Sequence, residues 1–332
     1  MSNKIILAGD IGGTKTLLAL YECSGSNLFE LKSKRYESKE YSNIEIIVND
    51  FLSSQQIVPQ AAAFGIPGPV ENGKVKSTNL PWLVDEKKLS KHTGIPKLKI
   101  VNDLAATAFD IPYLKQDEII LIKDGMKEKR SERYVIVAPG TGLGQAFLVC
   151  EGDKKIVLPS EGGHSDFAPT NEIEAELFIY LLKKYNRVSY ERIISGSGLL
   201  NIYDFLVETN FSKPKDKTIA RMKTEGKAAV ISEQAISGKD KVCEKALDIF
   251  ISVLGAHSGN LVITLLATGG VYLGGGIPHK ILPKLQDAAF TKSFVNKGRL
   301  KNIVDETPVY VINNNYAALH GAARIAESLM TD

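Results

Sequence analysis

One sequence motif occurs twice in this chain: a short apolar strand, a glycine-rich loop and a second short apolar strand. The first copy runs from Lys4 to Ala8, through the loop Gly9–Thr14 and into LLALYEC. The second runs from Tyr134 to Ala138, through PGTGLG and into AFLVCEG. The spacing of roughly 130 residues is too long for a solenoid repeat. The duplication predicts two related α/β domains, each offering one phosphate-binding turn to a shared cleft.

Composition restricts the partners of the chain. The 332 residues are enough for about two domains, and a hydrophobic content of 44% is ordinary for a chain with a full apolar core. Lys and Arg total 41 against 38 Asp and Glu, a net charge of +3 without a strongly basic block. Neither nucleic acid nor an anionic membrane is indicated, because binding to either depends on clustered positive charge. We therefore expect small-molecule ligands.

The cysteines and the apolar segments indicate a compartment. Cys23, Cys150 and Cys243 lie far apart without a CxxC spacing, which argues against a disulfide framework and a zinc cluster. The apolar segment near the N-terminus is too short for a signal peptide. The most apolar stretch, 261–278, is interrupted by threonines and glycines, which favours a buried helix followed by a strand over a membrane span. We expect a cytoplasmic protein.

The first glycine loop resembles a P-loop without matching it. In GDIGGTKT, Gly9, Lys15 and Thr16 are in register with GxxxxGK[ST], but Thr14 stands where the second glycine belongs. A P-loop opens a helix whose N-terminus faces the phosphates, whereas LLALYEC has strand character. We therefore reject the P-loop. We predict a tight hairpin whose backbone N–H groups converge on phosphate oxygens, with the Thr14 hydroxyl as a further donor.

Asp10 is the unusual residue of this loop. A carboxylate beside a phosphate repels it unless a cation lies between the two, so we predict that Asp10 holds Mg²⁺, directly or through water. The alternative is that Gly12 and Gly13 only form a hairpin turn, which Asp10 caps.

Two further glycine groups support a nucleotide. Gly140, Gly142 and Gly144 form GxGxG, a weak relative of the dinucleotide fingerprint, but a strand and not a helix follows, so Rossmann-type binding is not indicated. The run Gly274–Gly276 allows a third close approach of the backbone to a ligand. Together the three places suit a nucleotide with a phosphate tail and a purine.

Asn102 and Asp103 stand where a predicted strand ends and a helix begins. Both residue types are favoured there as helix caps in any protein, which is the simpler interpretation. The ends of strands in α/β sheets are also where ligands bind. An aspartate so placed can accept a hydroxyl proton while the oxygen attacks a terminal phosphate, which contributes roughly 10²- to 10⁴-fold in rate.

The segment EGGH, from Glu161 to His164, has several interpretations. Zinc is the weakest, because the histidines are scattered at 92, 164, 257, 279 and 320. A serine triad with Ser160 and Asp166 also fails, since such close neighbours do not line up and no nucleophile elbow is present. Recognition of substrate hydroxyls remains, with a buried pair held by backbone hydrogen bonds as the alternative.

Two other polar residues have weaker signals. Glu191, in VSYER, is predicted to lie near the start of a helix and could simply favour its positive end. Asn79, in TNLPW beside Trp82, offers an amide and a neighbouring aromatic face, both common in carbohydrate sites; a turn is the alternative.

Taken together, these motifs resemble those of the bacterial glucokinase family, in the same order. They are GDIGGTKT, TNLPW, VNDLAATAFDIP, APGTGLGQAFLV, PSEGGHSDFAP, VSYERIISGSGLLNIY and GGVYLGGGI. The resemblance spans nearly the whole chain and is loosest at about 210–245, a lysine-rich segment in which we expect a solvated helical surface. One departure is Gln145, where small apolar residues are usual. The cysteine-rich zinc motif of the related family of repressors and kinases is absent from the sequence.

The resemblance implies a fold and a reaction. The fold is the two-domain actin-like ATPase (ribonuclease H-like) fold, with a small α/β domain at 1–113 plus 304–332 and a large one at 114–303. The reaction is transfer of the γ-phosphate of MgATP to the 6-hydroxyl of glucose, the first step of glycolysis. The expected partners are glucose and ATP, in a homodimer, with no nucleic acid and no membrane.

The resemblance also implies roles for single residues. Asp103 becomes the general base. The sugar contacts are Asn79, Asn102, Asp103, Glu161, His164 and Glu191. The nucleotide contacts are Gly9, Asp10, Ile11, Gly12, Gly13, Thr14, Thr141, Gly142, Gly275 and Gly276.

Two other classes of protein fit these motifs less well. We do not expect a sugar-sensing regulator, because it needs a DNA-binding segment and the first loop begins at Gly9. A filament-forming actin-like protein has no reason to carry EGGH and VSYER.

Overall fold

The computed structural model describes residues 4–25, 27–53, 57–77, 80–126, 131–152 and 154–330. The chain divides into two compact units. The first unit comprises 1–115, 157–159 and 314–332, and the second 116–156 and 160–313. Residues 304–313 thus lie in the second unit and not in the small domain, where the expected boundary at 304 put them. The reason is strand pairing, because β13 (Val309–Ile312) runs parallel to β12 (Gly270–Leu273) and antiparallel to β8 (Ile119–Lys123).

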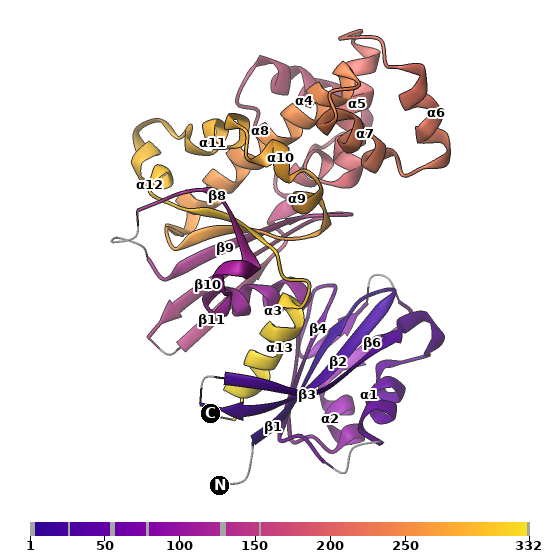
Figure 1. Ribbon diagram of the computed structural model, residues 1–332, viewed down its shortest axis with the longest axis vertical. Coiled ribbons are helices and arrows are strands. Elements are labelled where there is room, and N and C mark those ends of the chain that lie inside the picture. The colour runs from indigo at the N-terminus through magenta and orange to yellow at the C-terminus, as the bar shows by residue number, and fades with distance from the viewer. Residues whose placement is uncertain are drawn as a thin grey trace. The chain divides into compact units, whose positions relative to one another are not determined.

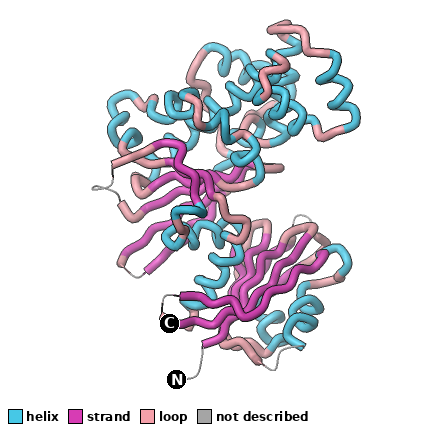
Figure 2. Tube along the Cα trace, in the orientation of Figure 1, coloured by secondary structure: helices cyan, strands magenta, loops and turns pink. Residues whose placement is uncertain are grey.

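The first unit is built on a sheet of five strands in the order β3-β2-β1-β4-β7 (Figures 1 and 2). The strands are β1 (Lys4–Ile11), β2 (Lys15–Ser24), β3 (Asn27–Glu37), β4 (Ala61–Ile66) and β7 (Lys97–Asn102). β1 and β2 form the antiparallel hairpin expected from the first glycine loop, whereas β1, β4 and β7 are parallel. The carboxyl ends of these three strands therefore meet at one edge of the sheet, where ligands bind in such folds.

Helices cover both faces of this sheet. Leu7 packs with α1 (Ile44–Ser53) and α2 (Glu86–Thr93), whereas Ile6 packs on the other face with α3 (Asp103–Asp110) and α13 (Ala317–Ser328). This alternation follows from the period of two along a strand. α3 and α13 lie side by side (Figure 1), and Gly321 is needed there because a Cβ would collide with the carbonyl oxygen of Ala106. The shorter elements are η1 (Ser38–Glu40), β5 (Lys74–Lys76), β6 (Leu83–Asp85) and η2 (Ile111–Tyr113).

The second unit repeats this plan. Its sheet has the order β11-β10-β9-β12-β13-β8, with β9 (Arg133–Pro139), β10 (Leu143–Glu151) and β11 (Lys154–Ser160) completing the strands. β9 and β10 form an antiparallel hairpin, and β12 runs parallel to β9 and β13. Both sheets therefore have an antiparallel glycine hairpin followed by two parallel strands, which confirms the duplication expected from the sequence.

The core of the second unit is organised around α8 (Lys241–Leu265). This helix is long and apolar enough to cross a membrane by length and composition, but 78% of its apolar window is buried inside the protein. It ends at Leu265 and β12 follows, as predicted for the most apolar stretch. Asp240 caps the helix by accepting from the N–H of Val242, and its other oxygen accepts from the Thr218 hydroxyl. The other helices are α4 (Glu172–Tyr185), α5 (Gly196–Glu208), α7 (Lys227–Ile236), α9 (Gly276–Lys280), α10 (Leu282–Leu285), α11 (Ala288–Val295), α12 (Lys301–Asp305), η3 (Gln116–Glu118), η4 (Gly162–His164), η5 (Tyr190–Arg192) and η6 (Gly298–Leu300).

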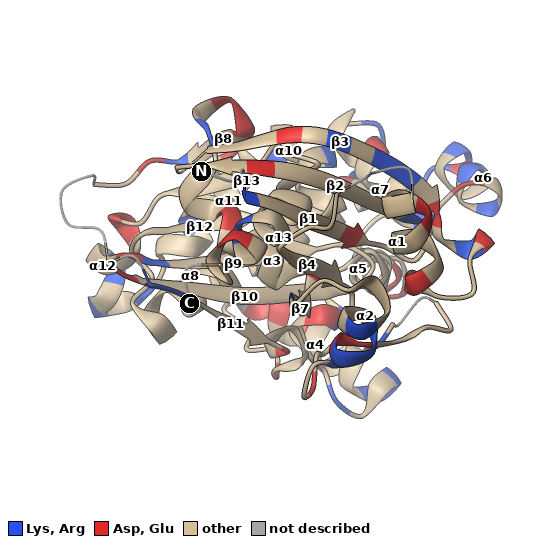
Figure 3. Ribbon diagram, turned by 90° about the horizontal axis from the view of Figure 1, so that it is seen from below, with Lys and Arg blue, Asp and Glu red and all other residues tan. Residues whose placement is uncertain are grey.

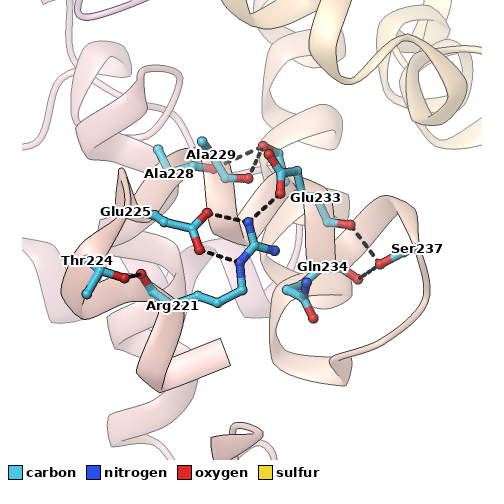
Figure 4. A network of polar contacts seen from close by, with 9 residues as sticks. Arg221, Thr224, Glu225, Ala228, Ala229, Glu233, Gln234 and Ser237 are labelled. Atoms are coloured by element: carbon cyan, nitrogen blue, oxygen red, sulfur yellow. Dashed lines mark hydrogen bonds and ion pairs between the residues drawn. The ribbon is translucent and has the colours of Figure 1, made fainter. Parts of the chain in front are cut away.

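The lysine-rich segment is helical, as expected, but only part of it is solvated, because α7 buries Val230 and Ile231 and α8 begins with the buried Val242. α6 (Asp216–Thr224) has one acidic residue, Asp216, at its start and basic residues along the rest of its length (Figure 3). Arg221 on α6 makes a two-pronged ion pair with Glu225 and a further bond to Glu233 on α7 (Figure 4). Exposed ion pairs stabilise proteins little unless their geometry is bidentate or several charges form a network. The ion pairs of Arg221 meet both conditions. The network fixes α6 to α7.

Candidate active site

The first glycine loop is a hairpin between β1 and β2. Ile11 pairs with Thr16, and the N–H of Gly12 donates to the carbonyl of Lys15 at 2.8 Å. A strand and not a helix follows, so the P-loop was rightly rejected. Glycine at position 12 suits this tight turn, because a Cβ would lie 3.0 Å from the carbonyl oxygen of Lys15. Gly13 and Thr14 complete the turn, and within the described ranges their N–H groups have no acceptor in the protein. Such free amides suit a phosphate.

Ser38 stabilises this hairpin, and no sequence motif predicts that role. Its hydroxyl donates to the carbonyl of Gly12 at 2.8 Å and lies 2.9 Å from the Thr16 hydroxyl, while its N–H donates to the carbonyl of Thr14. Ser38 is fully buried. No motif marks it, because it comes from η1 after a further strand and meets the loop only through folding.

Asp10 and Asp103 are brought together at the carboxyl edge of the first sheet. Asp10 lies opposite Gly65 in the pairing of β1 with β4, and Gly65 pairs with Val101 of β7. A Cβ on Gly65 would lie 3.4 Å from the Cα of Asp103. The start of α3 therefore packs directly against Gly65 at the end of β4.

The two carboxylates affect each other electrostatically. Burial, and then the negative charge of Asp103, raise the pKa of Asp10 to about 6. Burial also raises the pKa of Asp103. The N–H of Leu104, which donates to its Oδ1 at 2.8 Å, has the opposite and smaller effect on this pKa. In the described part of the chain the second oxygen of Asp103 has no hydrogen-bond partner outside its own residue. A raised pKa and a free oxygen are the properties of a general base.

This arrangement fits a cation as well. Two partly buried carboxylates that repel each other are stabilised by a divalent ion, and Mg²⁺ is typically held by one or two carboxylates together with substrate phosphates. Among the described residues no group of three or more His, Cys, Asp or Glu forms a complete metal cage. The residues present therefore fit an ion shared with a nucleotide.

Asn102 is a helix cap in the structure. Its Oδ1 accepts from the N–H groups of Leu104 and Ala105, and its Nδ2 donates to the carbonyl of Gly68 at 3.2 Å. The cap interpretation therefore holds for Asn102, which also ties the loop after β4 to the start of α3. Asn79 lies outside the described residues.

The second glycine loop is a hairpin held by Glu191. The N–H of Gly140 donates to the carbonyl of Gly142 at 2.8 Å, which closes the turn around the exposed Thr141. Glu191 Oε2 accepts from the N–H of Leu143 at 3.0 Å. A Cβ on Gly142 would lie only 2.6 Å from that oxygen, so glycine is required for Glu191 to reach the strand.

Glu191 also connects to EGGH. Its Oε1 lies 3.9 Å from Nδ1 of His164, whose side chain is exposed. Glu161 is exposed and accepts through its carbonyl from the N–H of His164. Gly163 packs so closely on β10 that a Cβ would collide with the carbonyl of Leu143. Glu161, His164 and Glu191 thus gather beside the second hairpin, and their open polar groups can bind hydroxyls.

A helix does begin near Ser189, as predicted, but it is the three-residue 3-10 helix η5, with Ser189 at its N-cap and Glu191 in its first turn. The longer helix α5 begins only at Gly196, where the Ser195 hydroxyl accepts from the N–H of Gly198. Glu191 thus lies at a helix start, as the alternative expected, while its Oε2 accepts from the N–H of Leu143.

The run Gly274–Gly276 lies next to the same hairpin. The N–H of Gly274 donates to the carbonyl of Val137, and Gly275 has a φ of +78°, where a Cβ would lie 2.8 Å from the carbonyl oxygen of Pro139. Both conditions require glycine at 275. Gly276 then opens α9. The run therefore continues the second hairpin and widens the surface that its backbone offers to a ligand.

Comparison with known proteins agrees with this geometry. The glucokinase family model matches residues 7–329. The chain is 40% identical to a glucokinase of Nostoc sp. (strain PCC 7120) over 98% of this chain and 99% of that protein. The structure of a glucokinase from an Antarctic psychrotroph superposes with a TM-score of 0.88 at 30% identity, covering 98% and 99% of the two chains. A glucokinase from Streptomyces griseus in complex with glucose and AMPPNP shares the fold, with a TM-score of 0.60 at 18% identity over 98% and 99%.

Two duplicated α/β units with glycine hairpins at equivalent places define the class: an actin-like ATPase fold of the kind found in sugar kinases. Within that class the matches cover almost the whole chain. The chain belongs to the glucokinase family.

Proposed function

We propose that this protein transfers the γ-phosphate of ATP to the 6-hydroxyl of glucose, giving glucose 6-phosphate and ADP. The observation that carries the proposal is the environment of Asp103. Its carboxylate stands at the carboxyl edge of a sheet with one oxygen free and a raised pKa, at the same edge as the glycine hairpin that follows β1. Membership of the glucokinase family supports the substrate assignment.

Asp103 acts as the general base. Its free oxygen accepts the proton of the 6-hydroxyl while the sugar oxygen forms a bond to the γ-phosphorus. The bond from that phosphorus to the bridging oxygen breaks, and the electron pair leaves with ADP. Proton acceptance by a positioned carboxylate is worth roughly 10²- to 10⁴-fold in rate.

Backbone amides hold the phosphates. In the first unit these are the amides of Gly13 and Thr14, and Gly9, Ile11 and Gly12 shape the strand and turn that present them. In the second unit Thr141 and Gly142 form the corresponding turn, and Gly275 and Gly276 line the adenosine side. Amide dipoles fixed in this way stabilise developing negative charge without reorganising.

The sugar is recognised by polar side chains. Glu161, His164 and Glu191 of the second unit bind hydroxyls, with Asn79, Asn102 and Asp103 of the first. Asn102 uses its Oδ1 to cap α3, so we assign sugar contact to its amide hydrogens only. A site that spends so many polar groups on hydroxyls rejects sugars that lack one, by up to ~10⁴-fold.

Asp10 is proposed to hold Mg²⁺. A bound ion would neutralise negative charge on the phosphates. Asp10 itself keeps its carboxylate next to the hairpin, where burial and Asp103 have raised its pKa, so that a cation there relieves the repulsion between the two acids.

We further propose that the protein works in the cytoplasm as the first enzyme of glycolysis, independent of nucleic acid and membranes. A homodimer stays a prediction, which sedimentation at micromolar concentration would test.

A coupled assay tests the function. ATP and Mg²⁺ are supplied with glucose, mannose or fructose, and formation of ADP is followed. We expect turnover with glucose and a kcat/KM at least ~10²-fold lower with mannose, whose 2-hydroxyl is inverted. Absence of glucose-dependent ADP formation would remove the proposed function.

A further inference from the structure

A buried polar pair lies behind the second hairpin. Gln145 of β10 is 3% exposed and His257 of α8 is 2% exposed, and their Nε2 atoms are 2.5 Å apart. Within the described part of the chain, Oε1 of Gln145 and Nδ1 of His257 are buried without a hydrogen-bond partner. Each unsatisfied buried polar atom costs about 1–3 kcal/mol, so a pair of this kind is costly and calls for a role.

Gln145 supports the EGGH segment from behind. A Cβ built on Gly162 would lie 2.5 Å from Oε1 of Gln145. The amide therefore sets how closely η4 packs on β10. Two residues later the segment reaches His164, whose ring faces Glu191.

His257 supports the other segment. Its ring lies against the ring of Tyr190, with centroids 3.9 Å apart and planes 36° from parallel. The Tyr190 hydroxyl accepts from Nδ2 of Asn260, one turn further along α8. Tyr190 directly precedes Glu191, so α8 fixes η5 through this stacked pair.

The two segments are also joined to each other. The N–H of Tyr190 donates to the carbonyl of Ser165, and the N–H of Phe167 donates to the carbonyl of Val188. A displacement of η4 or η5 must therefore move the other, and the Gln145–His257 bond ties both to the framework of β10 and α8.

His257 is neutral at physiological pH. Burial, and then the positive charge of Lys297, lower its pKa to about 4. A neutral imidazole has one donor and one acceptor, so it can pair with the Gln145 amide in only one tautomer for each amide orientation. The pair is therefore directional, which an apolar contact is not.

We propose that Gln145 and His257 are positioning residues that hold η4 and η5, and with them His164 and Glu191, in the arrangement that binds sugar hydroxyls. This inference rests on the proposed function. It explains why a glutamine occupies a position where the resemblance leads one to expect a small apolar residue. A better-ordered sugar site offsets the free-energy cost of the two buried polar atoms that lack hydrogen bonds.

The test is the double variant Gln145→Leu/His257→Phe. Replacing both partners by apolar groups of similar shape removes the unsatisfied atoms, so the variant should be at least as stable as the wild type. Its KM for glucose should nevertheless rise by roughly tenfold, as for one weakened hydrogen bond to a charged group, while kcat stays within about threefold and the KM for ATP is unchanged. A glucose KM within twofold of the wild type would overturn the proposal.

Thr218→Val is the matched control. It breaks another buried side-chain bond of the second unit, to Asp240, and should lower the melting temperature without changing the glucose KM. An equal rise in glucose KM in this control would show that any loss of stability acts on the site, which also overturns the proposal.

Hydrogen exchange separates the two proposals. If the wild type does not phosphorylate glucose, the proposed function fails, and the exchange of the Leu143 amide in ligand-free protein still measures positioning. This amide is bonded to Glu191 and should exchange at least tenfold faster in the double variant. Unchanged exchange there would refute the positioning role regardless of substrate.

Discussion

The charge of Asp103 reaches Asp10, and with burial it raises the pKa of Asp10 to about 6. The two residues come from different elements, the end of β1 and the start of α3, and both lie next to Gly65 of β4. Carboxylates in such a pair cannot both ionise without cost. Asp10 is thereby suited to bind a cation, and Asp103 is suited to accept a proton.

The stability of the protein should depend on the protonation of Asp10. Because its pKa is higher in the folded than in the unfolded state, Asp10 contributes stability that is complete below about pH 4 and is lost as the pH rises through about 6. Asp10→Asn mimics the protonated form. Without divalent cations it should raise the free energy of unfolding at pH 7 by about 1–3 kcal/mol and leave it unchanged at pH 4. Urea titrations at the two pH values measure this difference.

Asp50→Asn is the control. Hydrogen bonds from Lys34 and then Tyr36 lower the pKa of Asp50, so its contribution has the opposite sign and is lost on acidification. This variant should gain no stability at pH 7. If Asp10→Asn raised the free energy of unfolding equally at pH 4 and pH 7, the ionised carboxylate of Asp10 would not be the source of the instability.

The Mg²⁺ dependence of turnover should shift when Asp10 is changed. In Asp10→Asn the neutral amide attracts the ion less, so the Mg²⁺ concentration for half-maximal activity should rise by at least roughly tenfold, and excess EDTA should abolish the activity of wild type and variant alike. The measurement is initial rate against free Mg²⁺ at saturating ATP. An unchanged Mg²⁺ titration would exclude Asp10 as the ligand.

Gly142 and Gly140 provide a matched pair of alanine substitutions. The methyl group of Gly142→Ala would lie 2.6 Å from Oε2 of Glu191 and push that side chain from the Leu143 amide, whereas a Cβ on Gly140 meets nothing within 4 Å. Gly142→Ala should therefore raise the glucose KM by roughly tenfold, and Gly140→Ala by less than about twofold. Steady-state kinetics on glucose would contradict the role of Glu191 if both variants behaved alike.

Ser38 should matter for the nucleotide. Ser38→Ala removes the donor to Gly12 and leaves the buried Thr16 hydroxyl without its partner, which should lower stability by about 1–3 kcal/mol and raise the KM for ATP several-fold. Ser33→Ala, which removes an exposed bond to Glu30 on β3, is the comparison and should change neither quantity. An equal KM for ATP in the two variants would show that the hairpin does not need the hydrogen bonds of Ser38.

The fold was predictable where local pattern and duplication agree. Strand, glycine loop and strand could be recognised at 4–23 and at 134–152, because apolar runs and turn residues are local signals. The boundary at 304 was misplaced, since β13 belongs to the second sheet through pairing with β12 and β8. Pairing between segments distant in the sequence leaves no trace in either segment alone.

The candidate site was predictable to a similar degree. Motif resemblance marked Asp103, Glu161, His164 and Glu191, but it did not separate the capping role of Asn102 from ligand contact. Ser38 and Gly65 carried no signal, because their importance comes from packing against residues far along the chain. Three-dimensional neighbours of this kind become visible only in the folded structure.

Turnover of Asp103→Ala measures the central claim most directly. With the base removed, kcat for glucose phosphorylation should fall by at least ~10²-fold, while the affinity for glucose, measured by calorimetry, should stay within about tenfold. Turnover equal to that of the wild type, with glucose still bound, would contradict the role of Asp103 as the base.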